Sequence, residues 1–259
     1  MTHRTIGFIG GGRVVRILLQ GLQHAGQMPR GIVVSDPGPD ALAGLRERFP
    51  KLAISPADNL EAATRELVIL AVHPPVIPEV LTQIRPVLKA NAVMVSLAPK
   101  FTFAKLSSML GGFDRIVRII PNAPSLIGAG YNPMAFSSSL PAGDRDEVVS
   151  LFAPLGEHPE VDETKLEGYA LLSGMGPTYF WFQMQVLREL AAGFGLTEEE
   201  VVPALKRTLC GATRTLLESG LASAEVMDLV PVKPLGDVQG EIVEMYRTRL
   251  TALFQKIKP

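Results

Sequence analysis

Short apolar runs alternate with helical patterns over the first 160 residues of the chain. The runs lie at residues 6–9, 32–34, 52–54, 67–72, 92–95 and 115–120. The run at 67–72 holds no polar residue, which is typical of a strand covered on both faces in a parallel sheet. Between the runs, apolar residues recur every three or four positions, as in Val14, Leu18 and Leu22, and this spacing predicts amphipathic helices. The alternation predicts a doubly wound α/β sheet.

Near residue 164 the strand signals end and helical patterns alone remain. Residues 171–193 are predicted to form one long helix that is apolar nearly all round, and such a helix must be buried on every side. Packing against a second copy of the chain provides that burial, so we expect a homodimer.

Two more helices are expected, over residues 197–220 and 237–257. The first begins at Thr197 with Glu200 three residues later, which is the spacing of a capping box. The chain is therefore predicted to have two domains, an α/β domain over 1–160 and an all-helical dimerisation and substrate domain over 161–259.

A glycine-rich turn follows the first apolar run and leads directly into a helical pattern. At such a turn the backbone approaches a pyrophosphate closely, and the helix N-terminus favours the anion. The third small residue of a full fingerprint is replaced by Val15, so a glycine-rich turn of any α/β protein is the alternative. The residues expected to contact a dinucleotide at this Rossmann-like turn are Gly10, Gly12, Arg13 and Val14.

The second strand ends in Ser35 and Asp36, where dinucleotide folds meet the adenine ribose. A carboxylate at this position favours NAD, whereas a small hydroxyl with a nearby arginine, here Arg13, accepts the extra phosphate of NADP. Both residue types are present, so the sequence leaves NAD and NADP open.

Later strands end at the same edge of the predicted sheet, because the strands are parallel. The residues expected to line the nicotinamide there are Val72, His73, Pro74, Ala98 and Asn122.

The composition and charge of the chain disfavour several classes of function. The 259 residues carry a net charge of −1, which offers no electrostatic basis for binding nucleic acid or an anionic membrane. The single cysteine, Cys210, is interpreted as a small buried apolar residue on a helix, and the four histidines lack metal-ligand spacing. No signal peptide or membrane span is recognised, so we expect a cytoplasmic protein without a metal site.

Several segments resemble the pyrroline-5-carboxylate reductase family. The turn at 8–12 is similar to that family's F-I-G-x-G, and residues 71–74 resemble A-V-K-P, with His73 in place of lysine. The alternative to a cofactor contact by His73 is that it only fills the space of that lysine. Residues 117–124 resemble V-R-x-M-P-N-T-P, and residues 172–179 resemble L-S-G-S-G-P-A-Y. The resemblance implies an NAD(P)H-dependent reductase of a cyclic imine such as 1-pyrroline-5-carboxylate, with the substrate at the dimer interface.

The chain departs from the family pattern around the implied substrate site. The family's S-P-G-G-T-T is replaced by V-K-P-L-G-D at residues 232–237, and its serine between two glycines is Met175. By position, Asp237 is the candidate for pairing with the substrate nitrogen, and Lys233 and Met175 are candidates for binding substrate. The alternative is that Asp237 only caps the last helix and that Lys233 is solvated.

Other interpretations remain open. A β-hydroxyacid dehydrogenase is disfavoured, because the implied interdomain helix at 177–190 has no lysine to act as acid and base. A catalytically silent dinucleotide-binding relative, or a reductase of another small imine or keto acid, fits the altered segment. Glu163 and Glu167, near the domain junction, are interpreted as a solvated helix start rather than as acid catalysts.

Overall fold

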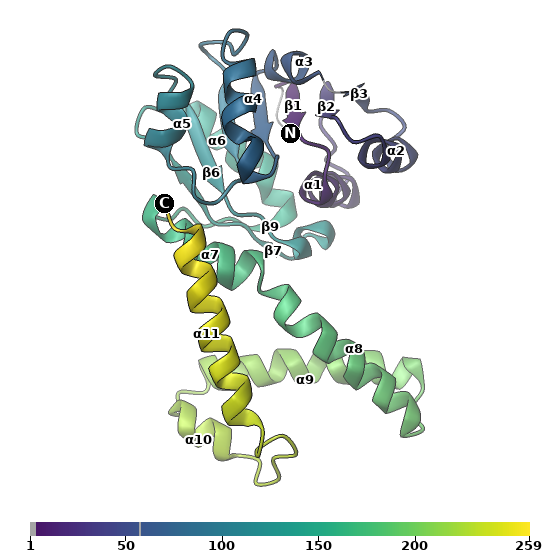
Figure 1. Ribbon diagram of the computed structural model, residues 1–259. Coiled ribbons are helices and arrows are strands. Elements are labelled where there is room, and N and C mark those ends of the chain that lie inside the picture. Colours follow the sequence, from purple (N-terminus) through teal and green to yellow (C-terminus); the bar gives the residue numbers. More distant parts are fainter. Residues whose placement is uncertain (1–3, 57) are drawn as a thin grey trace. The chain divides into compact units, whose positions relative to one another are not determined.

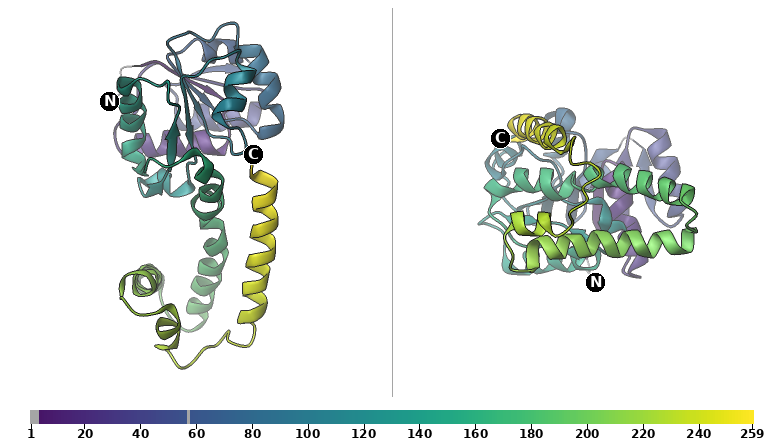
Figure 2. Two further views of the ribbon diagram at one scale, coloured as in Figure 1. Left: turned by 90° about the vertical axis from the view of Figure 1, so that its left-hand side faces the viewer. Right: turned by 90° about the horizontal axis from the view of Figure 1, so that it is seen from below.

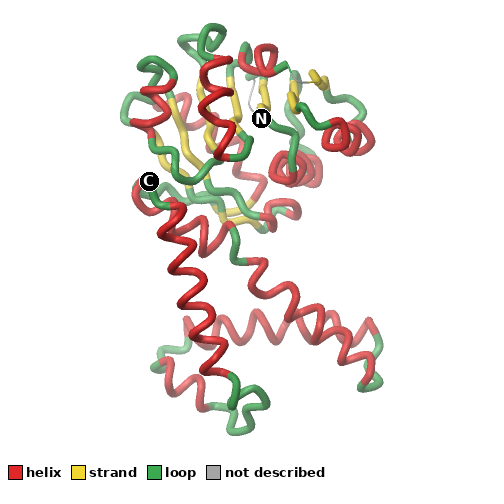
Figure 3. Tube along the Cα trace, in the orientation of Figure 1, coloured by secondary structure: helices red, strands yellow, loops and turns green. Residues whose placement is uncertain are grey.

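The computed structural model describes residues 4–56 and 58–259. Their contacts divide the chain into two compact units. The first unit runs up to Pro177 and also includes Phe254–Pro259, and the second unit is Thr178–Leu253. The strands lie in the first unit, whereas the second consists of helices joined by loops (Figure 3).

The first unit is built on a seven-stranded sheet of order β3-β2-β1-β4-β5-β6-β8 (Figure 1). Its strands are parallel except β8, which pairs antiparallel with β6. The strand bounds are β1 Ile6–Ile9, β2 Ile32–Asp36, β3 Ala53–Pro56, β4 Leu67–Leu70, β5 Val93–Ser96, β6 Ile116–Ile119 and β8 Met134–Phe136. Two further short strands, β7 Gly130–Tyr131 and β9 Gly156–Glu157, pair with each other. The predicted doubly wound α/β sheet is confirmed, and its strand order reverses between β1 and β4.

Helices cover both faces of the sheet (Figure 2). Buried side chains of one cluster belong to α1 Arg13–His24, α2 Pro39–Arg48 and α6 Ala142–Phe152. Those of the opposite cluster belong to α3 Asn59–Ala63, α4 Ile77–Ile84 and α5 Phe103–Met109. Alternate strand residues enter the two clusters, for example Phe8 in the first and Ile9 in the second, because successive side chains of a strand point to opposite faces.

The first unit extends beyond the boundary that the sequence pattern predicts at residue 160. Helix α7, Leu166–Tyr169, and the π-helical turn Ala170–Gly174 pack onto the sheet unit. Leu166 and Ala170 are buried there with Ile120 of the strand end. The contacts therefore place residues 161–177 with the α/β unit.

The second unit contains α9 Glu198–Glu218 and α10 Ser223–Asp228, together with most of α8 Pro177–Gly193 and α11 Gln239–Ile257. The capping box predicted at Thr197 is present, and the Thr197 amide donates to Glu200 Oε2 at 2.8 Å. The helix expected over 171–193 instead begins at Pro177, after the π-helical turn.

Large apolar side chains of the second unit are exposed, so the burial expected for its apolar helix is not provided by the described residues of one chain. Phe182 of α8 is 64% exposed and Leu217 of α9 is 74% exposed. Cys210 is also exposed, so its interpretation as a buried apolar residue is wrong for the single chain. None of the helices in the described residues is sufficiently long and apolar to span a bilayer.

One carboxylate ties the start of β1 to the start of β4, and it makes folding stability depend on pH. Glu66 Oε2 accepts the Thr5 amide at 2.9 Å and the Thr5 hydroxyl at 3.0 Å, and the backbone bond in particular lowers the Glu66 pKa. The folded protein therefore favours the ionised carboxyl more than the unfolded chain does. This stabilisation is complete above the usual glutamate pKa of about 4.3 and is lost as the pH falls through the lowered folded value.

Glu66→Gln is expected to reduce the free energy of unfolding by about 1 kcal/mol at pH 7. The difference from the unmodified protein should shrink as the pH is lowered through the acid range, as measured by urea denaturation at several pH values. Glu47→Gln, at an exposed position on α2, is the control. A difference that grows on acidification would contradict the assigned sign.

Candidate functional site

The glycine turn lies at the carboxyl end of β1, between the ends of β2 and β4. Gly10 has a φ of +100°, in the region that favours glycine, and its amide donates to the Ser35 carbonyl at 2.7 Å. A Cβ at Gly10 would lie 2.6 Å from the Ala71 carbonyl oxygen, so the position has no room for a side chain. The backbone therefore passes tightly across the point where the strand order reverses.

Helix α1 begins directly after this turn with an uncapped N-terminus. Gly12 is the N-cap residue and provides no side-chain acceptor, and the first turn of the helix carries no acidic residue. A Cβ placed on Gly12 would meet nothing within 4 Å, so the space in front of the helix is open. The exposed Arg13 follows immediately. The positive end of the helix dipole and the free amides of the first turn attract an anion, and the space in front of them is open. This N-terminus therefore suits the pyrophosphate of a dinucleotide.

The end of β2 presents a carboxylate. Asp36 is half-buried, and its Oδ2 and Oδ1 accept the amides of Gly11 and Gly38, each at 2.7 Å. Ser35 is fully buried, and its hydroxyl donates to Asn59 Oδ1 at 2.9 Å. Of the two residues that the sequence offers for the adenine ribose, only Asp36 is therefore displayed at the edge of the sheet.

The turns after β4 and β5 lie at the same edge. A Cβ on Gly10 would come within 3.2 Å of Val72 Cγ1, so Val72 borders the glycine turn. His73 is exposed at the N-terminus of the short 3-10 turn Pro74–Val76. Ala98 is 5% exposed and lies two residues beyond the end of β5. The structure thus brings these sequence-predicted residues to the carboxyl edge that carries Gly10.

Asn122 lies at the end of β6, but its side chain is occupied within the protein. Its Oδ1 accepts the Tyr131 amide at 3.0 Å, and its Nδ2 donates to the Ser173 carbonyl at 3.3 Å. Asn122 therefore holds the segment that carries Met175, which is half-buried at the end of the π-helical turn. The structure supports an indirect role for Asn122 at the site.

A buried ionic cluster was not anticipated from the sequence. Arg118 of β6 is 1% exposed, and its Nη2 lies 2.6 Å from Glu167 Oε1, while its Nη1 lies 2.9 Å from Glu163 Oε1. Glu167 is also 1% exposed, so its interpretation as a solvated residue is wrong, and Glu163 is bound to arginine rather than free in solvent. The sequence feature that indicates this cluster is an arginine inside an otherwise apolar strand, because a buried charge requires a partner of opposite charge.

Two of the three candidates for substrate contact, Lys233 and Asp237, lie in the second unit. Lys233 Nζ is 3.3 Å from Asp228 Oδ1, with both side chains largely exposed. Asp237 is exposed in the loop that precedes α11. The cofactor candidates all belong to the first unit, and the substrate roles of these two residues stay predictions.

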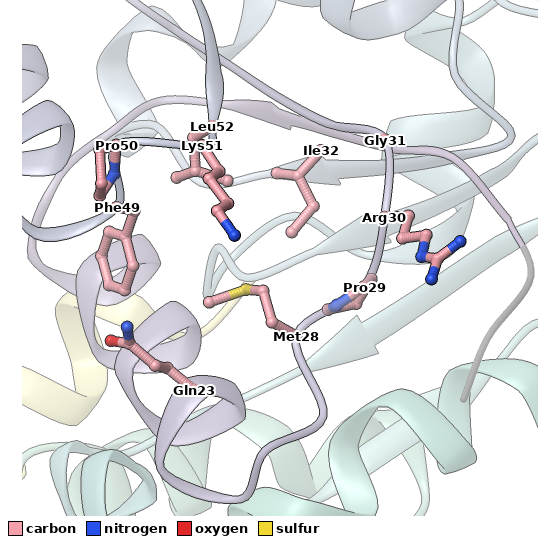
Figure 4. A pocket seen from close by; sticks show the side chains of 10 residues that line it. All are labelled: Gln23, Met28, Pro29, Arg30, Gly31, Ile32, Phe49, Pro50, Lys51 and Leu52. Atoms are coloured by element: carbon pink, nitrogen blue, oxygen red, sulfur yellow. The ribbon is translucent and has the colours of Figure 1, made fainter.

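A cavity of about 570 Å³ lies at the amino ends of β2 and β3, and Figure 4 shows its lining. Phe49, Ile32 and Met28 form apolar walls, and the Lys51 ammonium points toward Met28. Ligands of doubly wound sheets bind at the carboxyl ends of the strands, so this cavity is separate from the dinucleotide site.

Comparison with known proteins agrees with the geometry. Residues 5–100 match the family profile described as "NADP oxidoreductase coenzyme F420-dependent". The pyrroline-5-carboxylate reductase of Mycobacterium tuberculosis is 31% identical over 86% of this chain and 79% of its own length. The Escherichia coli enzyme of the same name is 28% identical over 88% and 85%.

Solved structures of similar proteins share the fold. A pyrroline-5-carboxylate reductase from Coxiella burnetii is 29% identical, with a TM-score of 0.69 over 99% of this chain and 95% of that chain. A Plasmodium falciparum pyrroline carboxylate reductase with NADP bound is 22% identical, with a TM-score of 0.74 over 99% and 95%. By its sequence relatives, the chain belongs to the pyrroline-5-carboxylate reductase family of NAD(P)H-dependent oxidoreductases acting on a C=N bond.

Proposed function

We propose that the protein uses NADH or NADPH to reduce the C=N bond of a small cyclic imine that carries a carboxylate, with 1-pyrroline-5-carboxylate as the first candidate. The observation that carries the proposal is the tight Gly10 turn, which leads into an uncapped helix N-terminus at the carboxyl edge of the sheet. The names of the relatives in M. tuberculosis and E. coli supply the substrate class.

In this proposal the cofactor lies across the strand ends. The turn at Gly10 and Gly12 and the amides of Arg13 and Val14 hold the pyrophosphate, and Asp36 accepts hydrogen bonds from the adenine ribose. The turns after β4 and β5, which carry Val72, His73, Pro74 and Ala98, position the nicotinamide. Positioning the ring against the acceptor carbon is the main requirement for hydride transfer, since the bound nicotinamide supplies the hydride.

The substrate side is proposed to involve Asp237, Lys233 and Met175. Asp237 is a carboxylate suited to stabilise a protonated imine nitrogen, and Lys233 is a cation suited to the substrate carboxylate. The exposure of both side chains leaves them accessible to a ligand.

Oxidation of NADH and NADPH by the purified protein with 1-pyrroline-5-carboxylate tests the proposal, together with a direct titration of each cofactor. Turnover supports it, and Asp237→Asn should then lower kcat; an unchanged kcat would remove Asp237 from the mechanism. Cofactor binding without turnover would favour a reductase of another imine or keto acid, or a silent relative. Failure to bind either cofactor would overturn the proposal.

For the cofactor, we propose a preference for NADH over NADPH that depends on Asp36. Its carboxylate accepts the ribose hydroxyls of NADH, whereas the 2′-phosphate of NADPH would meet a like charge. Asp36→Ser is expected to shift the ratio of the two dissociation constants toward NADPH by about 10- to 100-fold. The matched control is Asp114→Ser, which removes the same charge at the amino end of β6. Equal affinities for both cofactors in the unmodified protein would contradict the preference.

For the assembly, we propose a homodimer formed through the helical unit. An apolar groove of about 790 Å³ between α8 and α9 is lined by Trp181, Phe182 and Cys210, and apolar side chains continue along both helices. Exposed apolar surface of this extent is typical of an interface. Light scattering coupled to size-exclusion chromatography should give a dimer, and Phe182→Glu should shift it toward monomer. A monomeric unmodified protein would contradict the proposal.

A further inference from the structure

The turn that follows β5 has an unusual backbone. Lys100 has a φ of +74° and is the one non-glycine residue with positive φ among those the structure describes. A lysine has no preference for this left-handed conformation, so the surrounding structure must impose it. The residue next but one before it, Ala98, is among the residues proposed to face the nicotinamide.

Two glutamates hold this turn by its backbone. Glu167 Oε1 accepts the Lys100 amide at 2.9 Å, and Glu163 Oε1 accepts the Phe103 amide at 2.6 Å. The same two oxygen atoms receive the guanidinium of Arg118, at 2.6 and 2.9 Å. One buried arginine therefore fixes two carboxylates, and each carboxylate fixes one end of the turn.

The arginine and one of the two glutamates of this cluster are buried. Arg118 and Glu167 are each 1% exposed, and charge-assisted hydrogen bonds in such surroundings are strong. Arg118 Nε and Glu167 Oε2 are buried without a hydrogen-bond partner among the described residues. Arg118 and Glu167 thus each keep one buried polar atom without a hydrogen bond. In contrast, Glu167 Oε1 accepts hydrogen bonds from both the Lys100 amide and the Arg118 guanidinium.

We propose that Arg118, Glu163 and Glu167 form a positioning clamp that sets the orientation of the nicotinamide through the turn at 98–103. The inference rests on the proposed function. None of the three residues touches the cofactor in this arrangement; each acts through the turn. The clamp controls hydride transfer and leaves binding of the adenine half, at Gly10 and Asp36, unaffected.

The main test is Glu167→Leu, which removes the acceptor of the Lys100 amide, compared with the conservative Glu167→Gln, which retains an acceptor oxygen. Glu167→Leu is expected to lower kcat about tenfold, the effect of losing one charged hydrogen bond, whereas Glu167→Gln should lower it less. The dissociation constant of ADP-ribose, which lacks the nicotinamide, should stay the same in both variants. The fluorescence of bound NADH should change in Glu167→Leu, because it reports the surroundings of the nicotinamide.

A second substitution distinguishes an effect on the position of the turn from an effect on the stability of the fold. Adding Lys100→Gly to Glu167→Leu should restore kcat, because glycine adopts the left-handed conformation without help. The melting temperature should stay low, since the arginine still lacks one partner. Failure of Lys100→Gly to restore kcat would overturn the clamp.

A surface variant covers the case in which Glu167→Leu does not fold. Lys100 is exposed, so Lys100→Val leaves the buried cluster intact, but a β-branched residue opposes the positive φ. Lys100→Val should lower kcat relative to Lys100→Gly, and equal kcat values for the two would overturn the inference. If the unmodified protein binds neither NADH nor NADPH, the proposed function fails; if it binds one of them and reduces the imine, these variants test the clamp alone.

Discussion

Replacing Arg118 with methionine is expected to lower the free energy of unfolding by about 3–5 kcal/mol. The guanidinium is 1% exposed and pairs with Glu163 and the equally buried Glu167, so its removal leaves a buried carboxylate without its cation. Denaturation in guanidinium chloride measures the effect as a shift of the midpoint at constant slope.

Arg145→Met is the matched control. Arg145 also pairs with a glutamate, Glu160, but both side chains are more than a third exposed, and exposed pairs contribute about 0–1 kcal/mol. The double variant Arg118→Met, Glu167→Leu should recover part of the lost stability, because it removes the unpaired charge. Equal effects of Arg118→Met and Arg145→Met would show that the buried cluster has no special role in folding.

Gly21→Ala is expected to destabilise the protein by about 1–3 kcal/mol, although alanine is the better helix former. Gly21 lies buried in α1, where a Cβ would come within 2.2 Å of the Ser125 carbonyl oxygen and 2.5 Å of Leu155 Cδ2. The helix or the segment it packs on must shift to admit one methyl group. Thermal and urea denaturation measure the loss.

Gly44→Ala, on another helix, is the control and is expected to have the opposite effect on stability. Gly44 lies in α2, and a Cβ there meets nothing within 4 Å. The substitution should therefore stabilise the protein by about 0.5–1 kcal/mol, which is the difference in helix propensity alone. If both alanine variants were stabilised equally, the close approach of α1 to Ser125 would not be the reason for glycine at position 21.

The interpretation of strand ends from the sequence located most of the candidate cofactor site. Gly10, Asp36, Val72 and Ala98 were predicted at one edge, and the structure places them there. Ser35 was predicted beside them, but it is fully buried with its hydroxyl bound to Asn59. Successive side chains of a strand point to opposite faces of the sheet. The sequence of the strand end therefore does not show which of Ser35 and Asp36 is accessible to a ligand.

Within the α/β domain expected over residues 1–160, three short strands and one helix are not predicted by the apolar pattern. β7, β8 and β9 have two or three residues each, which is too short for an apolar period to be recognised. Helix α6 carries apolar residues only in its second half, so its pattern is weak. These elements complete the sheet unit through pairing with distant segments rather than through local preference.

Local pattern alone determined the alternation of strands and helices, the glycine turn at Gly10, the capping box at Thr197 and the family resemblance, because each depends on residues close together in the chain. Tertiary structure decided the extent of the first unit, the burial of Glu167 and the backbone of Lys100. These features arise from contacts between segments far apart in sequence, such as the 2.6 Å bond from Arg118 to Glu167, and the free energy of burying such a pair depends on surroundings that only the folded chain provides.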